Sequence, residues 1–320
     1  MISIIIVNYN KSKFIKDTLH SVHEQTFKNW ECIIIDDCSS DNSISIITNF
    51  IKKDSRYKLI ENSKNLGASN SRNIGYESAK FDYVIFLDSD DVLTVDCLIN
   101  RKEVFVENEL IDFAVFPMGT FIKKKGDSKY VWNNFQGNTL DRFLSHDLPW
   151  ALPSVLWRKS FLKKLNGFNG KFRRLQDVEL HTRAIVESGG NYKIFDFSDP
   201  DCYYRIDDKR SVFKNHIESK CDGVISYIDF FVGYLKEKNV KHKRKFLRKT
   251  YFKFYSELIF YYKCNKLSND EFMMFVIKLS ECLEKCKLNN LKTRILICSY
   301  TNIKTWFNFK GLNYFFYKII

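Results

Sequence analysis

Short apolar runs alternate with amphipathic segments over the first 120 residues of the chain. Helical spacing of apolar residues, as in Ile15, Leu19 and Val22, predicts helices between these runs. Strands that are apolar throughout and separated by helices indicate a mostly parallel sheet covered on both faces. The runs typical of buried strands are SIIIVNYN at 3–10, the start of ECIIIDDCSSDNS at 31–43, YKLIE at 57–61, YVIFLD at 83–88 and DFAVFPM at 112–118.

The pattern changes after about residue 120. The segment FIKKKGDSKYVWNN predicts a hairpin, and RLQDVELHTRAIVESGG predicts a helix that ends at Gly189 and Gly190. From about residue 215 the chain reads as helices rich in Phe, Tyr and Lys. We therefore expect an α/β domain over 1–214 and a helical region over 215–320.

Polar residues gather where the predicted strands end. In parallel sheets, ligands bind beyond the carboxyl ends of the strands, so a site is expected there. Asp88, Asp90 and Asp91 repel one another, and a D-x-D at a strand end suits Mg²⁺ or Mn²⁺, which take oxygen ligands. A solvated acidic turn is the alternative for such a motif taken alone. The strand-end residues are Asn8, Asp36, Asp37, Asp88 and Asp90.

Charge divides the chain in the same way. Residues 231–320 contain 19 Lys and Arg against 6 Asp and Glu, which accounts for the entire net charge of +13. No apolar run reaches the roughly 18 residues of a membrane-spanning helix, and the first residues show no signal peptide. Nine scattered cysteines indicate reduced thiols and a cytoplasmic protein rather than a disulfide framework.

An ordered set of motifs resembles glycosyltransferase family 2, enzymes of the GT-A fold that transfer a sugar from a nucleotide diphosphate. The resemblance covers residues 1 to about 210 and implies a Rossmann-like catalytic domain. Its nucleotide-sugar half would span about 1–118 and its acceptor half about 119–214. The motifs are SIIIVNYNK, CIIIDDCSSDNS, NLGASNSRNIG, YVIFLDSDD and RLQDVELHTRA.

The resemblance implies a role for each matching residue. Val7 and Tyr9 would border the base, Asp37 would bind the uracil ring, and Arg72 would reach the nucleotide. Among the three acids after the fourth strand, the family's ribose and sugar contact corresponds to Asp88, and its metal ligand to Asp90. The catalytic base corresponds to Asp177, and it follows Gln176 where many members have Glu.

Two further segments carry candidates. In YYRIDDKRS, Asp207 lies near the place where several relatives have an extra metal ligand, and Lys209 and Arg210 could clamp the diphosphate. An ordinary charged loop is the alternative. In the segment WALPSVLW, Trp150 is the candidate for stacking on an acceptor sugar, whereas Trp157 is expected in the core.

The resemblance implies an inverting glycosyltransferase that uses a UDP-sugar and Mn²⁺ or Mg²⁺. The acceptor would be a glycan or lipid-linked glycan, in surface polysaccharide synthesis. A nucleotidyltransferase is the first alternative, although the first strand is not followed by a Gly-rich loop. A nucleic-acid-binding protein is the second, because KHKRKFLRKTYFKFY is basic with interleaved aromatics, but carboxylates at the strand ends oppose it.

The basic, aromatic C-terminal region has three interpretations. Lys and Arg beside Phe, Trp and Tyr are typical of a helix lying in the headgroup layer of an anionic membrane. This would hold the enzyme on the inner face of the plasma membrane. A helical domain that packs its aromatics inward is the second interpretation, and a homodimer interface is the third.

Overall fold

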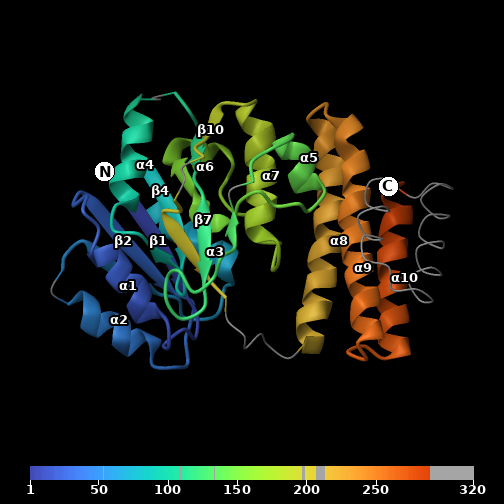
Figure 1. Cartoon of the computed structure of the whole chain (residues 1–320), viewed down its shortest axis with the longest axis horizontal. Helices are drawn as coiled ribbons and strands as arrows, with labels where there is room; N and C mark the ends of the chain where they lie inside the picture. Colours follow the sequence, from blue (N-terminus) through green and yellow to red (C-terminus); the bar gives the residue numbers. More distant parts are fainter. Residues whose placement is uncertain (53, 108–109, 133, 197–198, 207–212, 289–320) are drawn as a thin grey trace. The chain divides into compact units, whose positions relative to one another are not determined.

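The computed structural model describes residues 1–52, 54–107, 110–132, 134–196, 199–206 and 213–288. It divides into two compact units. The first unit combines residues 1–136 with 149–208, and the second combines residues 137–148 with 209–320. The short segment 137–148 thus belongs with the helical residues, which the sequence pattern does not indicate. Each unit is described by itself below (Figure 1).

The first unit is built on a seven-stranded sheet. Its order is β10-β6-β9-β4-β1-β2-β3. The strands β3, β2, β1 and β4 run parallel, and β9 is antiparallel to both β4 and β6. The expected α/β class with a mostly parallel sheet is confirmed. The strands are β1 (Ile2–Asn8), β2 (Trp30–Asp36), β3 (Tyr57–Glu61), β4 (Tyr83–Asp88), β6 (Phe113–Val115), β9 (Val155–Arg158) and β10 (Tyr192–Ile194).

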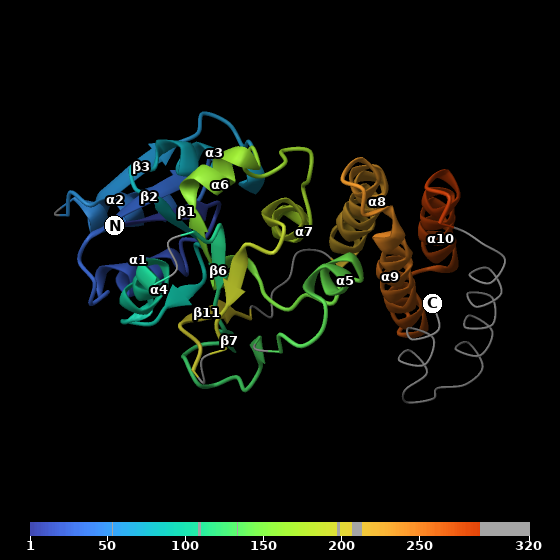
Figure 2. The same cartoon turned by 90° about the horizontal axis from the view of Figure 1, so that it is seen from above.

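Helices cover both faces of this sheet, which is why its central strands are apolar throughout. Ile4 and Ile6 of β1 share a core cluster with Leu19 of α1, whereas Ile5 faces α3, where Gly75 allows close approach. Figure 2 shows α1 and α4 on one side of the sheet and α3 and α6 on the other. The helices are α1 (Ile15–His23), α2 (Ser43–Ile51), α3 (Ala68–Ser78), α4 (Cys97–Glu107), α6 (Lys159–Lys164) and α7 (Gln176–Ser188).

A four-stranded sheet of order β5-β11-β7-β8 completes the first unit. Strands β7 (Met118–Phe121) and β8 (Val131–Trp132) form an antiparallel hairpin. The sequence predicts a hairpin in residues 121–134, but its first strand begins earlier, at Met118. Strand β11 (Cys202–Arg205) pairs with β5 (Val92–Leu93), which follows β4 almost directly. This pairing brings Arg205 beside the acidic turn. A short 3₁₀ helix, η1 (Leu152–Ser154), leads into β9.

The second unit is helical. It contains α5 (Thr139–Leu144), α8 (Phe213–Glu237), the 3₁₀ helix η2 (Lys241–Phe246), α9 (Leu247–Lys263) and α10 (Asn269–Lys285). Polar side chains of the long helices cap the carbonyl groups of α5: Thr250 Oγ1 donates to Leu144 O at 2.7 Å, and Tyr227 Oη to Phe143 O at 3.1 Å. These bonds explain why residues 137–148 pack here.

The aromatic residues of α9 mostly point inward. Tyr251, Phe252, Phe254 and Tyr255 are buried, whereas Phe260 is 54% exposed.

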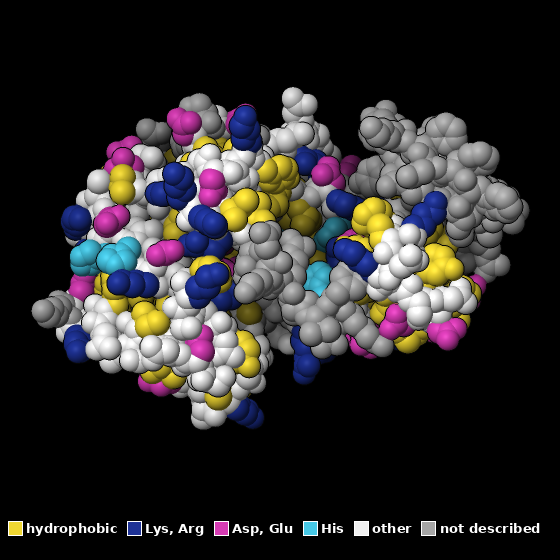
Figure 3. All heavy atoms as spheres, turned by 60° about the horizontal axis from the view of Figure 1, so that its bottom comes forward, with side chains coloured by type: hydrophobic (Ala, Val, Ile, Leu, Met, Phe, Trp, Pro, Cys, Tyr) yellow, Lys and Arg dark blue, Asp and Glu magenta, His cyan; other side chains and the backbone are white. Residues whose placement is uncertain are grey.

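Among the described residues, we find no helix that combines the length and apolarity needed to span a bilayer. On the first unit, Figure 3 shows Lys and Arg side chains interspersed with Asp and Glu, in line with the zero net charge of residues 1–230.

Candidate active site

The three acids at the end of β4, Asp88, Asp90 and Asp91, each have a different partner. Arg72 Nη2 donates to Asp88 Oδ1 at 2.7 Å. Lys11 Nζ donates to Asp90 Oδ2. The backbone N–H of Arg205 donates to Asp91 Oδ1 at 2.9 Å, and its Nε donates to Asp90 O at 2.9 Å. Two cationic side chains and one backbone donor from distant parts of the chain therefore offset the repulsion that the sequence implies.

The cluster still raises the pKa of two of its members. Burial raises the pKa of the Asp90 carboxyl, and the negative charge of Asp88 adds to this effect. Burial also raises the pKa of Asp91 well above the ordinary value, with further contributions from Asp88 and Asp90. A nearby cation would therefore stabilise the ionised form of these two carboxyl groups.

Arg72 joins this acidic turn to the start of α7. While Nη2 binds Asp88, its Nη1 donates to Gln176 Oε1 at 2.9 Å, and its guanidinium lies 5.2 Å from the ring centroid of Phe168. Only 7% of Arg72 is exposed, so its position is fixed by its neighbours. A buried Arg in a planar fork geometry holds its two partners at a defined separation.

Asp177 lies in the first turn of α7, next to Gln176. The preceding residue, Leu175, has φ 58° and adopts the left-handed conformation, which starts the helix abruptly at this point. Burial raises the pKa of the Asp177 carboxyl above its ordinary value; Arg72 lowers it and Asp88 raises it. A carboxylate with a raised pKa is a stronger base, which suits proton abstraction from a hydroxyl group.

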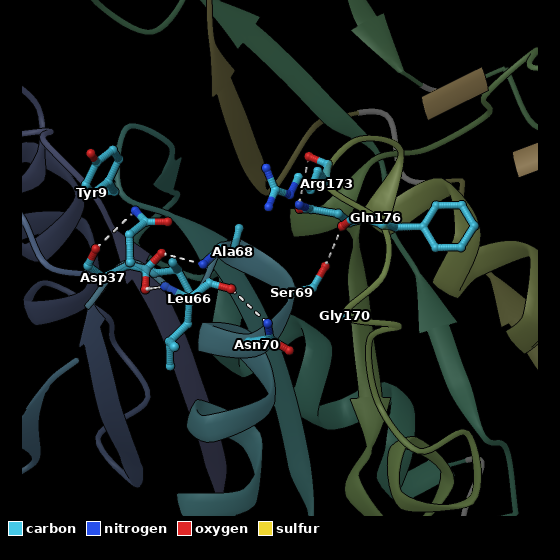
Figure 4. A pocket seen from close by; sticks show the side chains of 13 residues that line it. Tyr9, Asp37, Leu66, Ala68, Ser69, Asn70, Gly170, Arg173 and Gln176 are labelled. Carbon is cyan, nitrogen blue, oxygen red and sulfur yellow. Dashed lines mark hydrogen bonds between the residues drawn. The ribbon is translucent and has the colours of Figure 1, made fainter. Parts of the chain in front are cut away.

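A cavity of about 510 Å³ lies beside these residues. Figure 4 shows Tyr9 and Asp37 on one side of it and Arg173 and Gln176 on the other. This volume is within the range of pockets that hold a nucleotide-sized ligand. The lining residues are Val7, Tyr9, Asp37, Asn65, Leu66, Gly67, Ala68, Ser69, Asn70, Gly170, Phe172, Arg173 and Gln176.

Asp37 organises the loop that forms one wall of this cavity. Its Oδ1 accepts from Leu66 N at 2.8 Å and from Asn62 Nδ2 at 2.9 Å, and its Oδ2 accepts from Gly67 N at 2.9 Å. Gly67 has φ 82°, a conformation that favours glycine, and α3 starts directly after it. Asp37 is therefore both a lining residue and the anchor of the loop before α3.

Asn8 and Asp36 have a supporting role at the same strand ends. Asp36 Oδ2 accepts from Asn8 Nδ2 at 2.7 Å and from Ser39 Oγ at 2.7 Å, and both Asn8 and Asp36 are fully buried. Their polar groups stabilise the turn that follows β2. Asn8 and Asp36 therefore lie at strand ends, as expected, but they do not line the cavity.

The sequence profile of glycosyl transferase family 2 matches residues 3–164, half of the chain. The chain belongs to glycosyltransferase family 2. TuaG of Bacillus subtilis, a glycosyltransferase named for teichuronic acid biosynthesis, is 40% identical over 107 residues, which are 33% of this chain and 42% of TuaG. The Escherichia coli glucosyltransferase WfgD, named for UDP-Glc and a GlcNAc-diphosphoundecaprenol, is 36% identical over 110 residues, 34% of this chain and 43% of WfgD.

The matched segment spans less than half the length of either relative. Among solved structures, S. aureus TarS 1-349 in complex with UDP-GlcNAc superposes with a TM-score of 0.67 at 19% identity, covering 95% of this chain and 87% of TarS. This similarity shows the fold, and it confirms the GT-A architecture expected from the motifs.

The structure brings together Val7, Tyr9 and Asp37 at the cavity, and Arg72, Asp88 and Asp90 in the adjoining cluster with Asp177 nearby. Asp207, Lys209 and Arg210 lie outside the described residues. Their expected roles at the metal and the diphosphate stay predictions.

The expectation for Trp150 needs correction. Trp150 is 1% exposed, and its ring packs 6.0 Å from His181 and 6.5 Å from Tyr192, so neither ring face is open to a sugar. Trp157 is fully buried and stacks on His181 at 5.7 Å, as a core residue would. Trp150 therefore belongs to the core and does not present a ring face for stacking on an acceptor sugar.

Sequence reasoning missed Lys11 and Arg205. Both lie inside quoted motifs, SIIIVNYNK and YYRIDDKRS, but their partners are 79 and 115 residues away along the chain. In the sequence, the one indication of such partners was the acidic turn itself, because three neighbouring carboxylates need cationic groups from other parts of the chain.

Proposed function

We propose that this protein is an inverting glycosyltransferase that uses a UDP-sugar to extend a glycan. The observation that supports this most is the bridge made by Arg72. One guanidinium binds Asp88 of the D-x-D turn and Gln176 beside Asp177, and Gln176 also lines the cavity. Donor pocket, acidic turn and candidate base are thus adjacent, as transfer from a nucleotide sugar requires.

A uracil base fits the acceptor capacity that remains on Asp37. Each carboxylate oxygen can accept two hydrogen bonds. Among the described residues, Oδ1 already accepts two and Oδ2 accepts one, from Gly67 N. Oδ2 could therefore accept the single ring N–H of uracil, with Tyr9 and Val7 beside it. The UDP-GlcNAc complex of TarS and the UDP-Glc donor in the name of WfgD support the same base.

A divalent cation fits the acidic turn. Among the described residues no group of three His, Cys, Asp or Glu side chains is arranged to hold a metal, so Asp90 would hold the ion together with water and the donor phosphates. Beside Asp90, Asp91 Oδ2 is buried without a hydrogen-bond partner, so the turn carries negative charge that a nearby cation would stabilise. Asp90 would bind Mn²⁺ or Mg²⁺, and Asp88 the ribose and sugar. The ion would stabilise negative charge on the leaving diphosphate.

Asp177 would act as the base. It would take the proton from an acceptor hydroxyl while that oxygen forms a bond to the anomeric carbon and the bond to the nucleoside diphosphate breaks on the opposite face. The configuration inverts because a single displacement occurs. The raised pKa of Asp177 favours this proton transfer.

The acceptor and its location are proposed from the relatives and from charge. WfgD is named for a lipid-linked GlcNAc acceptor, and TuaG for polysaccharide synthesis. A lipid-linked glycan would place the enzyme on the inner face of the plasma membrane. The aromatic side chains of α9 that are buried cannot insert into a membrane. The basic residues of the region would therefore supply the attraction to anionic lipids. A homodimer remains an alternative use of this region.

The proposal is tested by incubating the purified protein with Mn²⁺ and a panel of UDP-, GDP- and dTDP-sugars and measuring nucleoside diphosphate release. We expect slow hydrolysis of at least one UDP-sugar, which stops in Asp90→Asn. No release from any UDP-sugar, or equal release by Asp90→Asn, would contradict the proposal.

A further inference from the structure

The backbone of Lys11 is fixed at the end of β1. Its N–H donates to Ser43 Oγ at 3.2 Å, and its carbonyl accepts from Phe14 N at 2.8 Å and Ile15 N at 2.9 Å. The preceding residue, Asn10, has φ 52° and accepts from Ser40 N at 2.8 Å. Only torsions of the Lys11 side chain can therefore move its ammonium group.

That ammonium group is held loosely compared with the other partners of the acidic turn. Arg72, which binds Asp88, is buried and also bound to Gln176. Asp91 accepts from a backbone N–H of β11. The Lys11 side chain is instead 36% exposed, although its partner Asp90 is only 19% exposed. Partly exposed ion pairs of long side chains contribute little net stability, so this pair can exchange readily.

Lys11 and a divalent cation would compete for the same carboxylate. The ammonium group occupies Asp90 Oδ2, and two cations at one oxygen repel each other strongly in a partly buried site. A lysine side chain has a flexible four-carbon stem, so it can leave the carboxylate while its backbone stays in place. The nearest anion created by donor binding would be the diphosphate.

We propose that Lys11 is an exchangeable counter-ion that couples donor binding to metal binding. It neutralises Asp90 in the empty site and moves to the donor diphosphate when a divalent cation takes Asp90. Lys11 is then a positioning residue rather than a catalytic one. This inference rests on the proposed function, because it requires a metal on Asp90 and a nucleoside diphosphate in the cavity.

The exchange predicts cooperative binding. Without nucleotide, the cation must displace Lys11 from Asp90, and the ammonium group returns to water. With UDP bound, the displaced ammonium group gains a phosphate partner. The affinity for Mn²⁺ should therefore rise when UDP is bound, and the affinity for UDP should rise by the same factor when Mn²⁺ is bound.

The test compares Lys11→Met with Lys13→Met. Lys13 is an exposed neighbour on the same segment. Both ammonium groups lie near the ring of Phe14: that of Lys13 is 4.9 Å from the ring centroid, and that of Lys11 is 5.7 Å from it. Free Mn²⁺ is measured by electron paramagnetic resonance, with and without UDP, and the Mn²⁺ bound by UDP itself is measured in a titration without protein and subtracted. We expect Lys11→Met to bind Mn²⁺ alone roughly fivefold more tightly and to lose a corresponding part of the coupling to UDP, while the part that comes from direct contact between the cation and the diphosphate stays. Lys13→Met should match the wild type, and Lys11→Arg should retain much of the coupling.

The variant Asp90→Asn distinguishes the metal assignment of Asp90 from the role proposed for Lys11. If it weakens Mn²⁺ binding while Lys11→Met leaves both Mn²⁺ affinity and coupling unchanged, the role of Lys11 is refuted and the metal assignment stands. If Lys13→Met changes both quantities as much as Lys11→Met does, the effect is general charge and the inference also fails. If Asp90→Asn leaves Mn²⁺ binding unchanged, both the metal assignment and the exchange are wrong.

Discussion

Among the single residues, Asp177 is the one to which we assign proton transfer. An Asn at this position keeps the size and polarity of the side chain but cannot accept a proton. Transfer by Asp177→Asn should therefore fall by about 10²–10⁴-fold, while the affinity for the donor stays near that of the wild type. Steady-state rates together with a donor titration measure both quantities. Transfer within tenfold of the wild type would exclude Asp177 as the base.

The raised pKa of Asp177 gives a second expectation at this scale. The base must be deprotonated to act, so kcat/KM should fall as pH drops through its pKa. Because burial raises that pKa, the acid limb of the profile should lie above the ordinary Asp value of about 3.9. A pH–rate profile for a fixed donor and acceptor measures the limb. An acid limb at or below the ordinary value would contradict the environment described for Asp177.

At the scale of elements, the contact between α3 and β1 depends on Gly75. A Cβ there would lie 2.2 Å from Ile5 Cγ2, inside a packed core. Gly75→Ala should destabilise the protein by about 1–3 kcal/mol because the core must shift. In contrast, Gly233 in α8 is exposed, and no heavy atom lies within 4 Å of the position that a Cβ would occupy there. Gly233→Ala should stabilise by about 0.5–1 kcal/mol through helix propensity.

Thermal denaturation of the two variants checks this contrast. The midpoint should decrease for Gly75→Ala and increase for Gly233→Ala. Equal midpoints for Gly75→Ala and the wild type would mean that α3 does not lie against β1 as described.

The sequence alone predicts some of the secondary-structure elements but not the contacts between distant ones. The strands β1, β2, β3, β4 and β6 were predictable, because each depends on a local run of apolar residues, whereas the two-residue strand β5 was not expected and β7 begins before the predicted hairpin segment. The bond between Arg72 and Gln176 joins residues 104 apart, and the burial of Trp150 depends on His181 and Tyr192. Such contacts follow from the packing of distant elements, which no local pattern contains.

At the scale of the whole molecule, the uneven charge predicts attraction to anionic membranes. Residues 231–320 carry the entire excess of +13, and each basic residue near an anionic surface contributes about 1 kcal/mol. The full-length protein should float with anionic liposomes, dissociate at high salt and lose binding when truncated near residue 230. Equal flotation with neutral liposomes, or none with anionic ones, would leave this region as a packing or assembly surface.

We propose above all that the cavity and the acidic turn together bind a nucleoside diphosphate with a divalent cation. The most direct measurement is a calorimetric titration of UDP, in the presence of Mn²⁺, into the wild type and Asp90→Asn. The account predicts saturable binding to the wild type and a loss of its metal-dependent part in a variant that remains folded. Binding of UDP and Mn²⁺ to Asp90→Asn as tight as to the wild type would contradict it.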